Sequence, residues 1–242
     1  MIRTRTVAVV VSAGLLFAAR AAAEDFFAEA NPATVTAVEK PAGPPPDHGV
    51  QIGLRSGFGL PFGKPYDADV SLKGDFKGVI PIWVDAGYRF NPAMYLGAYG
   101  MFGYGLMNTG NNVCGADGVS CSGYNVRVGI NGQYHFLPKG SVDPWFGVGF
   151  GYEWLHNQAS GPGGSISQTF RGVELLGLQI GTDFEVDQNI KLGPFIGYSI
   201  GQFGYGKQTY DTAQLKGTSN LGISNMALHE WLVFGVRVVL NI

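Results

Sequence analysis

The chain has 242 residues, a formal net charge of −2, and 38 glycines beside 16 Phe, 11 Tyr and 4 Trp. Because glycine in a helix interior costs about 1 kcal/mol relative to alanine, this composition excludes a helical protein and leaves the all-β and disordered classes. The small excess of acidic residues also argues against nucleic acid as a partner, since nucleic-acid binding depends on clustered Lys and Arg.

The N-terminal segment has the features of a secretory signal peptide. Arg3 and Arg5 precede a short apolar run, Arg20 ends that run, and three alanines then offer a cleavage site. The run is shorter than the roughly 20 residues that a helix needs to cross a bilayer, which disfavours the alternative of an uncleaved anchor. We therefore predict that residues 1–23 are removed on export, and the loss of three arginines then takes the formal net charge from −2 to −5.

Residues 24–48 are predicted to be a leader that separates the signal peptide from the rest of the chain. The segment lacks a sustained hydrophobic period and contains Pro44, Pro45 and Pro46, a composition typical of extended, semi-rigid linkers. We expect a mostly disordered, proline-rich periplasmic leader. No cysteine lies near residue 24, so a lipid anchor at the new N-terminus is not expected.

Residues 49–242 are predicted to form one all-β domain. Bulky apolar side chains alternate there with small or polar ones, with the period of two that is typical of strands with two different faces. The clearest example is 124–136, where Val126 and Val128 flank Arg127. Eight such segments follow one another along the chain: 50–58, 79–90, 94–106, 124–136, 145–154, 176–186, 190–200 and 232–242.

The connections between these segments alternate strictly between long and short. The long, polar and glycine-rich ones are 59–78, 107–123, 155–169 and 202–227, and the short ones are 91–93, 137–143 and 187–189. All long connections therefore lie at one end of the fold, and both chain ends lie at the other. This order predicts an eight-stranded antiparallel up-and-down β-barrel.

The two faces of the predicted strands differ in size and charge. One face is bulky and apolar, and eight strands enclose a lumen only just wide enough for side chains, so this face does not fit inside. The other face is mostly glycine with a few charged residues, and an arginine facing lipid near the bilayer midplane costs about 2 to 4 kcal/mol. We therefore predict a transmembrane barrel with the bulky face outward and a luminal charge network made of Arg55, Asp85, Arg89, Arg127, Glu153, Asp183, Glu185 and Arg237.

In this arrangement the chain resembles the small eight-stranded bacterial outer-membrane β-barrels typified by the transmembrane domain of outer-membrane protein A. The resemblance covers residues 50–242 and lies in the architecture. It implies residence in the bacterial outer membrane, with outer-membrane lipid around the barrel, short periplasmic turns, long extracellular loops and both mature termini in the periplasm. It also implies the barrel-assembly machinery as a partner during insertion, although the last strand ends in Leu240 and Ile242 without the terminal aromatic residue usual in such families.

Cys114 and Cys121 are the only cysteines and lie in the same predicted long connection. An even number of cysteines in an exported protein favours a disulfide. The alternative, a metal site, needs further ligands, and none of the four histidines lies near in sequence. We predict a Cys114–Cys121 disulfide that stiffens the loop.

The predicted luminal charges balance, with four acids and four bases. Ion-selective pores are usually lined by rings of one sign, whereas balanced charges in a narrow lumen favour a paired network that plugs it. The sequence therefore favours an outer-membrane barrel with a structural, adhesive or surface-exposed role. The alternatives are a narrow, porin-like diffusion channel and an outer-membrane lipid-modifying enzyme.

The enzyme alternative finds little support in the motifs. A lipid A deacylase of this size is expected to carry a His-x-Ser motif. None of His135, His156 and His229 has a serine two positions later. We expect His156 and His229 to be solvent-exposed at the rim. No catalytic residue, cofactor site or metal site is predicted, and the sequence specifies no ligand for the long loops.

Overall fold

The computed structural model describes residues 48–66, 71–110, 113–221, 223 and 227–242. The predicted signal peptide and almost all of the predicted leader lie outside these residues. Within the described residues the chain forms nine strands and one short helix. No helix in this part of the chain is long and apolar enough to span a membrane.

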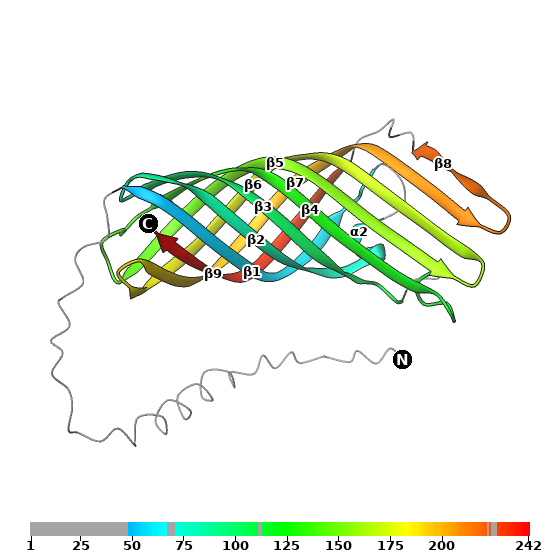
Figure 1. The fold of residues 1–242 in the computed structure, drawn as a ribbon, viewed down its shortest axis with the longest axis horizontal. Coiled ribbons are helices and arrows are strands. Elements are labelled where there is room, and N and C mark those ends of the chain that lie inside the picture. The colour runs from blue at the N-terminus through cyan, green and yellow to red at the C-terminus, as the bar shows by residue number, and fades with distance from the viewer. Residues whose placement is uncertain (1–47, 67–70, 111–112, 222, 224–226) are drawn as a thin grey trace, which may run out of the picture. The chain divides into compact units, whose positions relative to one another are not determined.

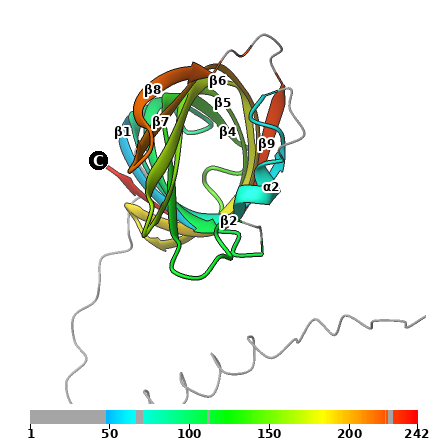
Figure 2. The same cartoon turned by 90° about the vertical axis from the view of Figure 1, so that its right-hand side faces the viewer.

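Eight of the strands close into an antiparallel ring, as Figures 1 and 2 show from the side and along the barrel. They are β1 (Gly49–Gly63), β2 (Phe76–Asn91), β3 (Met94–Met107), β4 (Ser120–His135), β5 (Val142–Gly161), β6 (Gly164–Asp187), β7 (Ile190–Thr212) and β9 (Leu228–Asn241). Sequence neighbours pair up to β7, β7 pairs with β9, and β9 pairs with β1 to complete the ring. The predicted eight-stranded up-and-down barrel is confirmed.

The outer surface of the barrel is bulky and apolar. Side chains such as Val84 and Ile130 are 54% and 59% exposed, although both lie in the middle of long strands. Outward aromatic pairs lie near the short-turn end, where Tyr134 contacts Phe136, and near the opposite end, where Phe102 stacks on Tyr124. An apolar band between two aromatic belts is the surface that a membrane-spanning barrel presents to lipid. The predicted orientation, with the bulky face outward, is confirmed by these exposures.

Two of the predicted long loops are largely strand. β5 and β6 extend beyond the ring until only residues 162–163 separate them, and Gly164 there has φ +122°, a conformation that favours glycine. β7 likewise continues to Thr212 and pairs with β8 (Lys216–Leu221), which forms no part of the ring (Figure 1). These connections lie between ring strands as predicted, but most of their described residues are strand rather than loop. The backbone hydrogen-bond ladder therefore continues after the apolar alternation of the side chains has ended.

The connection between β1 and β2 contains the helix α2 (Leu72–Asp75). The Ser71 hydroxyl accepts a hydrogen bond from the backbone N–H of Lys73, at 3.3 Å, and so caps the first turn. The helix lies at the end of the barrel that carries the long connections (Figure 2). It buries Leu72 there, so this connection helps to fill the lumen.

Candidate functional site

The first group of luminal charges lies around Arg55 on β1. Its Nε and Nη2 atoms donate to the two carboxylate oxygens of Asp85, each at 2.7 Å. Its Nη1 atom donates to Gln179 at 2.5 Å, and the guanidinium lies over the ring of Trp83. Asn131 donates to the same carboxylate at 3.0 Å. Side chains from four strands therefore supply the hydrogen bonds of this one buried ion pair.

A second ion pair joins β9 to β6. Arg237 donates to both oxygens of Asp183, at 2.8 and 2.5 Å, and to Gln133 at 2.8 Å. The Trp145 ring lies 3.8 Å from the guanidinium carbon, and its indole N–H also donates to Asp183. Planar, two-bonded contacts of this kind fix both partners in one geometry.

The third group is centred on Arg127, which lies between two carboxylates. Its terminal nitrogens are 3.5 Å from both Glu153 and Glu174, and one of them donates to Ser199 at 2.8 Å. Glu153 also contacts the Nε2 atom of His229 at 2.9 Å. The two acids therefore share Arg127, and Glu153 has His229 as a second partner.

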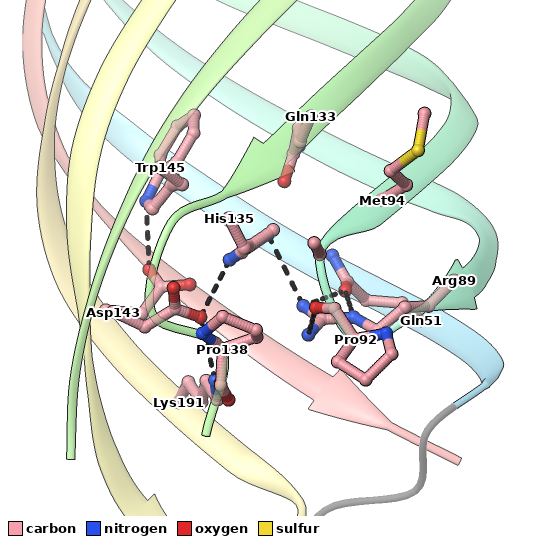
Figure 3. Close-up of polar contacts among 12 residues, drawn as sticks. Gln51, Arg89, Pro92, Met94, Gln133, His135, Pro138, Asp143, Trp145 and Lys191 are labelled. Atoms are coloured by element: carbon pink, nitrogen blue, oxygen red, sulfur yellow. Dashed lines mark hydrogen bonds and ion pairs between the residues drawn. The ribbon is translucent and has the colours of Figure 1, made fainter. Parts of the chain in front are cut away.

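A fourth group of polar side chains lies inside the barrel at the short-turn end (Figure 3). Asp143 lies 2.8 Å from the Nδ1 atom of His135 and 2.9 Å from the Lys191 ammonium. The other ring nitrogen of His135, Nε2, is 3.3 Å from Nη2 of Arg89. A guanidinium can only donate hydrogen bonds. His135 therefore accepts from Arg89 and donates to Asp143. Arg89 is held in turn by Gln51, at 2.9 Å.

Of the described residues, one group has the spacing of metal ligands. Atoms of His135, Asp143 and Asp183 lie within 4.8 Å of one another. However, both carboxylates already face cations, because Lys191 contacts Asp143 and Arg237 contacts Asp183. A divalent ion at this point would meet two neighbouring positive charges and a histidine whose nitrogens are both engaged, so the site does not fit a metal.

The structure brings most of the predicted charge network together. The residues Arg55, Asp85, Arg89, Arg127, Glu153, Asp183 and Arg237 are all at most 5% exposed. Glu185 is not part of the network, because its side chain is exposed near the end of β6. Sequence analysis missed Asp143, Glu174 and Lys191, which are buried inside.

The histidines were also misplaced by the sequence analysis. His229, expected to be solvent-exposed, is 0% exposed and paired with Glu153. His156 is half-buried, with Nδ1 2.9 Å from the Thr169 hydroxyl. The signal for His229 is its position inside the last strand, where it shares the inward face with Trp231 and Val233.

Large apolar side chains complete the filling of the lumen, where mostly glycine and charge were expected. Toward the end with the long connections they form an apolar layer, made of Leu72, Phe76, Val79, Leu155, Phe170, Phe203 and Trp231. A second cluster lies among the ion pairs and consists of Trp83, Tyr99, Met101, Trp145, Phe195 and Val233. Charged and apolar groups are thus interspersed in part of the interior.

Outside the apolar layer lies a cavity of about 340 Å³, here called the mouth pocket. It is lined by Pro65, Tyr66, Asp75, Met107, Val113, Cys114, Cys121, Asn157, Gln158, Ala159, Ile166, Gln168, Phe170 and Gln208. The predicted disulfide between Cys114 and Cys121 is confirmed and forms part of the wall. Asn157 donates to Asp75 at 3.2 Å. Burial raises the pKa of the Asp75 carboxyl, and this hydrogen bond offsets part of the rise.

Neither a protein-family model nor a curated protein matches the sequence. Among solved structures, a major outer membrane protein from Thermus thermophilus matches with a TM-score of 0.52 at 14% identity, covering 78% of this chain and 99% of that one. Neisserial surface protein A matches with a TM-score of 0.45 at 15% identity, covering 81% of this chain and 98% of that one. The outer membrane protein OprG from Pseudomonas aeruginosa matches with a TM-score of 0.43 at 12% identity, covering 80% of this chain and 97% of that one. The chain therefore has the fold of the small eight-stranded outer-membrane β-barrels that its sequence resembles.

Proposed function

We propose that the protein is an integral barrel of the bacterial outer membrane with a plugged lumen and a surface-exposed structural or adhesive role. The apolar outer band and its two aromatic belts support the membrane location. In this orientation the short turns and both ends of the barrel chain face the periplasm. The ribbons β5–β6 and β7–β8 then project from the cell, and they supply the surface for any contact.

The observation that carries the plug is the interlocking of the luminal charges. Arg55, Arg127 and Arg237 each bind a carboxylate and at least one neutral acceptor from another strand. Removing one partner of a buried pair typically costs about 3 to 5 kcal/mol. Opening a path past three such groups would break several of these contacts at once, so a standing pore is disfavoured.

The free space inside agrees with a plug. The cavity beside Arg55, Arg127 and Glu174 has a volume of about 30 Å³, room for about one or two water molecules. The apolar layer lies between this cavity and the mouth pocket, and Phe203 and Trp231 within it are at most 1% exposed. An ion would have to shed its water to pass such a layer.

Single-channel recording in planar bilayers tests the plug. The protein, inserted and checked for heat-modifiable migration on gels, is expected to give no steady openings under conditions where a known porin conducts. A variant that thins the plug, Phe203→Ala with Trp231→Ala and Arg127→Ala, is the matched control and is expected to conduct. Steady openings of large conductance by the unaltered protein would instead establish the narrow diffusion channel.

The proposal includes no catalytic role. Each strand histidine is engaged with a neighbour: His135 with Asp143, His156 with Thr169 and His229 with Glu153. A general base in such a site must reach a substrate proton, and the two fully buried histidines face the closed lumen rather than lipid or solvent.

A further inference from the structure

We propose that the outward face of β5, β6 and β7 binds a phosphorylated glycolipid of the outer leaflet, whose phosphate contacts Arg171 and Lys207. These three strands are neighbours in the barrel wall (Figure 1). The two cations lie on β6 and β7, near the end that carries the long connections. The proposed site rests on the membrane location and orientation of the proposed function, and it does not depend on the plug.

Arg171 and Lys207 point away from the lumen. On β6, Phe170 belongs to the apolar layer inside the barrel, so the residues on either side of it, Thr169 and Arg171, face outward. Lys207 is paired with Thr169 across the strands and therefore faces outward as well. Arg171 and Lys207 are both exposed. They are diagonal neighbours in this register, a separation of about 7 to 8 Å that long side chains bridge, so both can reach one phosphate.

The charges of Arg171 and Lys207 are not neutralised by the protein. Among the described residues, no carboxylate lies within ion-pair distance of either side chain. Residues 154–171 and 205–221 contain one acid, Asp211, and it lies 3.3 Å from Lys216. The guanidinium carbon of Arg171 is 5.8 Å from the centre of the Tyr205 ring, a contact that stabilises the side chain and leaves its charge in place. Guanidinium and ammonium groups of this kind bind phosphate.

The aromatic neighbours of Arg171 indicate an anion that belongs to a lipid. Trp154 on β5 and Tyr205 on β7 are in register with Arg171 on either side. Trp154 also contacts Tyr152, with ring centroids 4.7 Å apart. Outward aromatic side chains at the edge of an apolar band mark the level of the lipid headgroups. A phosphate held at this level places its acyl chains beside the apolar band, a contact that a soluble anion does not make.

Beyond the cations, the outward face consists of hydroxyl and amide side chains. Two residues past Thr169, the strand register aligns one such row across β4 to β8, made of Ser122, Gln158, Ser167, Thr209 and Thr218. These groups both donate and accept hydrogen bonds, as the hydroxyls of a sugar do. The order along the strands is therefore apolar, then cationic, then hydroxyl-rich, which matches the acyl chains, phosphate and sugar of a glycolipid.

Native mass spectrometry of the barrel released from lipid nanodiscs tests the proposal. The nanodiscs contain phosphatidylcholine with a minor amount of diphosphoryl lipid A, and we expect one glycolipid to stay bound. Matched nanodiscs carry phosphate-free lipid A, which lacks the anion, or phosphatidic acid, which lacks the sugar. Both are expected to be retained more weakly. Inositol hexakisphosphate, a soluble phosphate without acyl chains, is not expected to bind barrels in phosphatidylcholine alone.

Three double variants locate the bound glycolipid. A basic residue at a membrane surface changes binding about fivefold, so Arg171→Gln with Lys207→Gln is expected to weaken retention about thirtyfold. The matched control is Lys73→Gln with Lys77→Gln, which removes the same charge from α2 and β2 at the same end and is expected to retain the lipid. The exchange Arg171→Lys with Lys207→Arg preserves the charge and is expected to keep most of the binding. Heat-modifiable migration confirms that each variant is folded.

Several results would overturn the proposal. Equal loss in the two glutamine variants would reduce the effect to general charge attraction. Equal retention of phosphate-free lipid A or of phosphatidic acid would remove the phosphate or the sugar from the recognition, and binding of inositol hexakisphosphate would indicate a soluble ligand. A heat-modifiable barrel that retains no glycolipid contradicts this site alone, whereas a chain that stays dissolved without detergent contradicts the proposed membrane location.

Discussion

Glu174 shows how one extra residue changes which groups face the lumen. In β6 it is buried, while both Leu175 and Leu176 are exposed, because the pairing with β5 shifts between Gly149 and Gly151. Such a bulge places two successive residues opposite one. Counting alternation backward from Leu176 puts Glu174 outside. The alternation of side chains placed Arg55 and Arg237 inside correctly, because their strands are regular at these positions. Alternation alone does not show where a bulge interrupts it.

The pair formed by Arg237 and Asp183 gives a prediction at the same scale. Asp183→Asn leaves Arg237 buried without a counter-charge, and we expect the free energy of unfolding to fall by about 3 to 5 kcal/mol. The double variant Arg237→Met with Asp183→Leu replaces the pair by apolar groups and is expected to recover most of that loss. Urea titration of the barrel in vesicles measures both. A double variant no more stable than the single one would contradict this account.

At the scale of elements, the strands extend well beyond the segments that alternation identified. The core of each strand was predictable because its outward side chains are bulky and apolar and its inward ones include the charged groups, so the two faces differ in polarity. Where β5, β6 and β7 extend beyond the apolar band, that difference between the faces ends, although the backbone pairing continues. The mouth pocket lies in this region, so its residues carried no periodic signal. Its one predictable feature was the disulfide.

The Cys114–Cys121 disulfide provides the test for this region. The chain-entropy model assigns about 2 to 3 kcal/mol to closing so short a loop. Because the bridge joins the β3–β4 connection to the outer end of β4, beyond the residues of β4 that pair with β3, we expect Cys114→Ser with Cys121→Ser to leave heat-modifiable migration unchanged and to speed proteinase K cleavage within residues 113–119. Limited proteolysis followed by mass spectrometry checks this. Loss of the folded band would show that the bridge supports the ring itself.

For the whole molecule, the barrel has two distinct ends. The tight β5–β6 turn at residues 162–163 lies at one, and the β6–β7 turn at 188–189 lies at the other. With the proposed orientation, an epitope inserted after Gly163 is expected to bind antibody on intact Gram-negative cells. The same epitope after Gln188 is expected to bind only once the outer membrane is permeabilised. Flow cytometry with and without permeabilisation distinguishes the two sites. The reverse pattern would show that the barrel has the opposite orientation.

The luminal contacts also bear on how such a protein reaches its final state. Arg237 on β9 depends on Asp183 from β6 and Gln133 from β4, and Arg55 on β1 depends on Gln179 from β6. Until these strands meet, Arg237 lacks both of these partners, and Arg55 has Asp85 on the adjacent strand β2 but not Gln179. Completion of the circle removes all of these mismatches together. Because these contacts join strands that are far apart in the sequence, they favour the closed ring over any arrangement that lacks one of its strands.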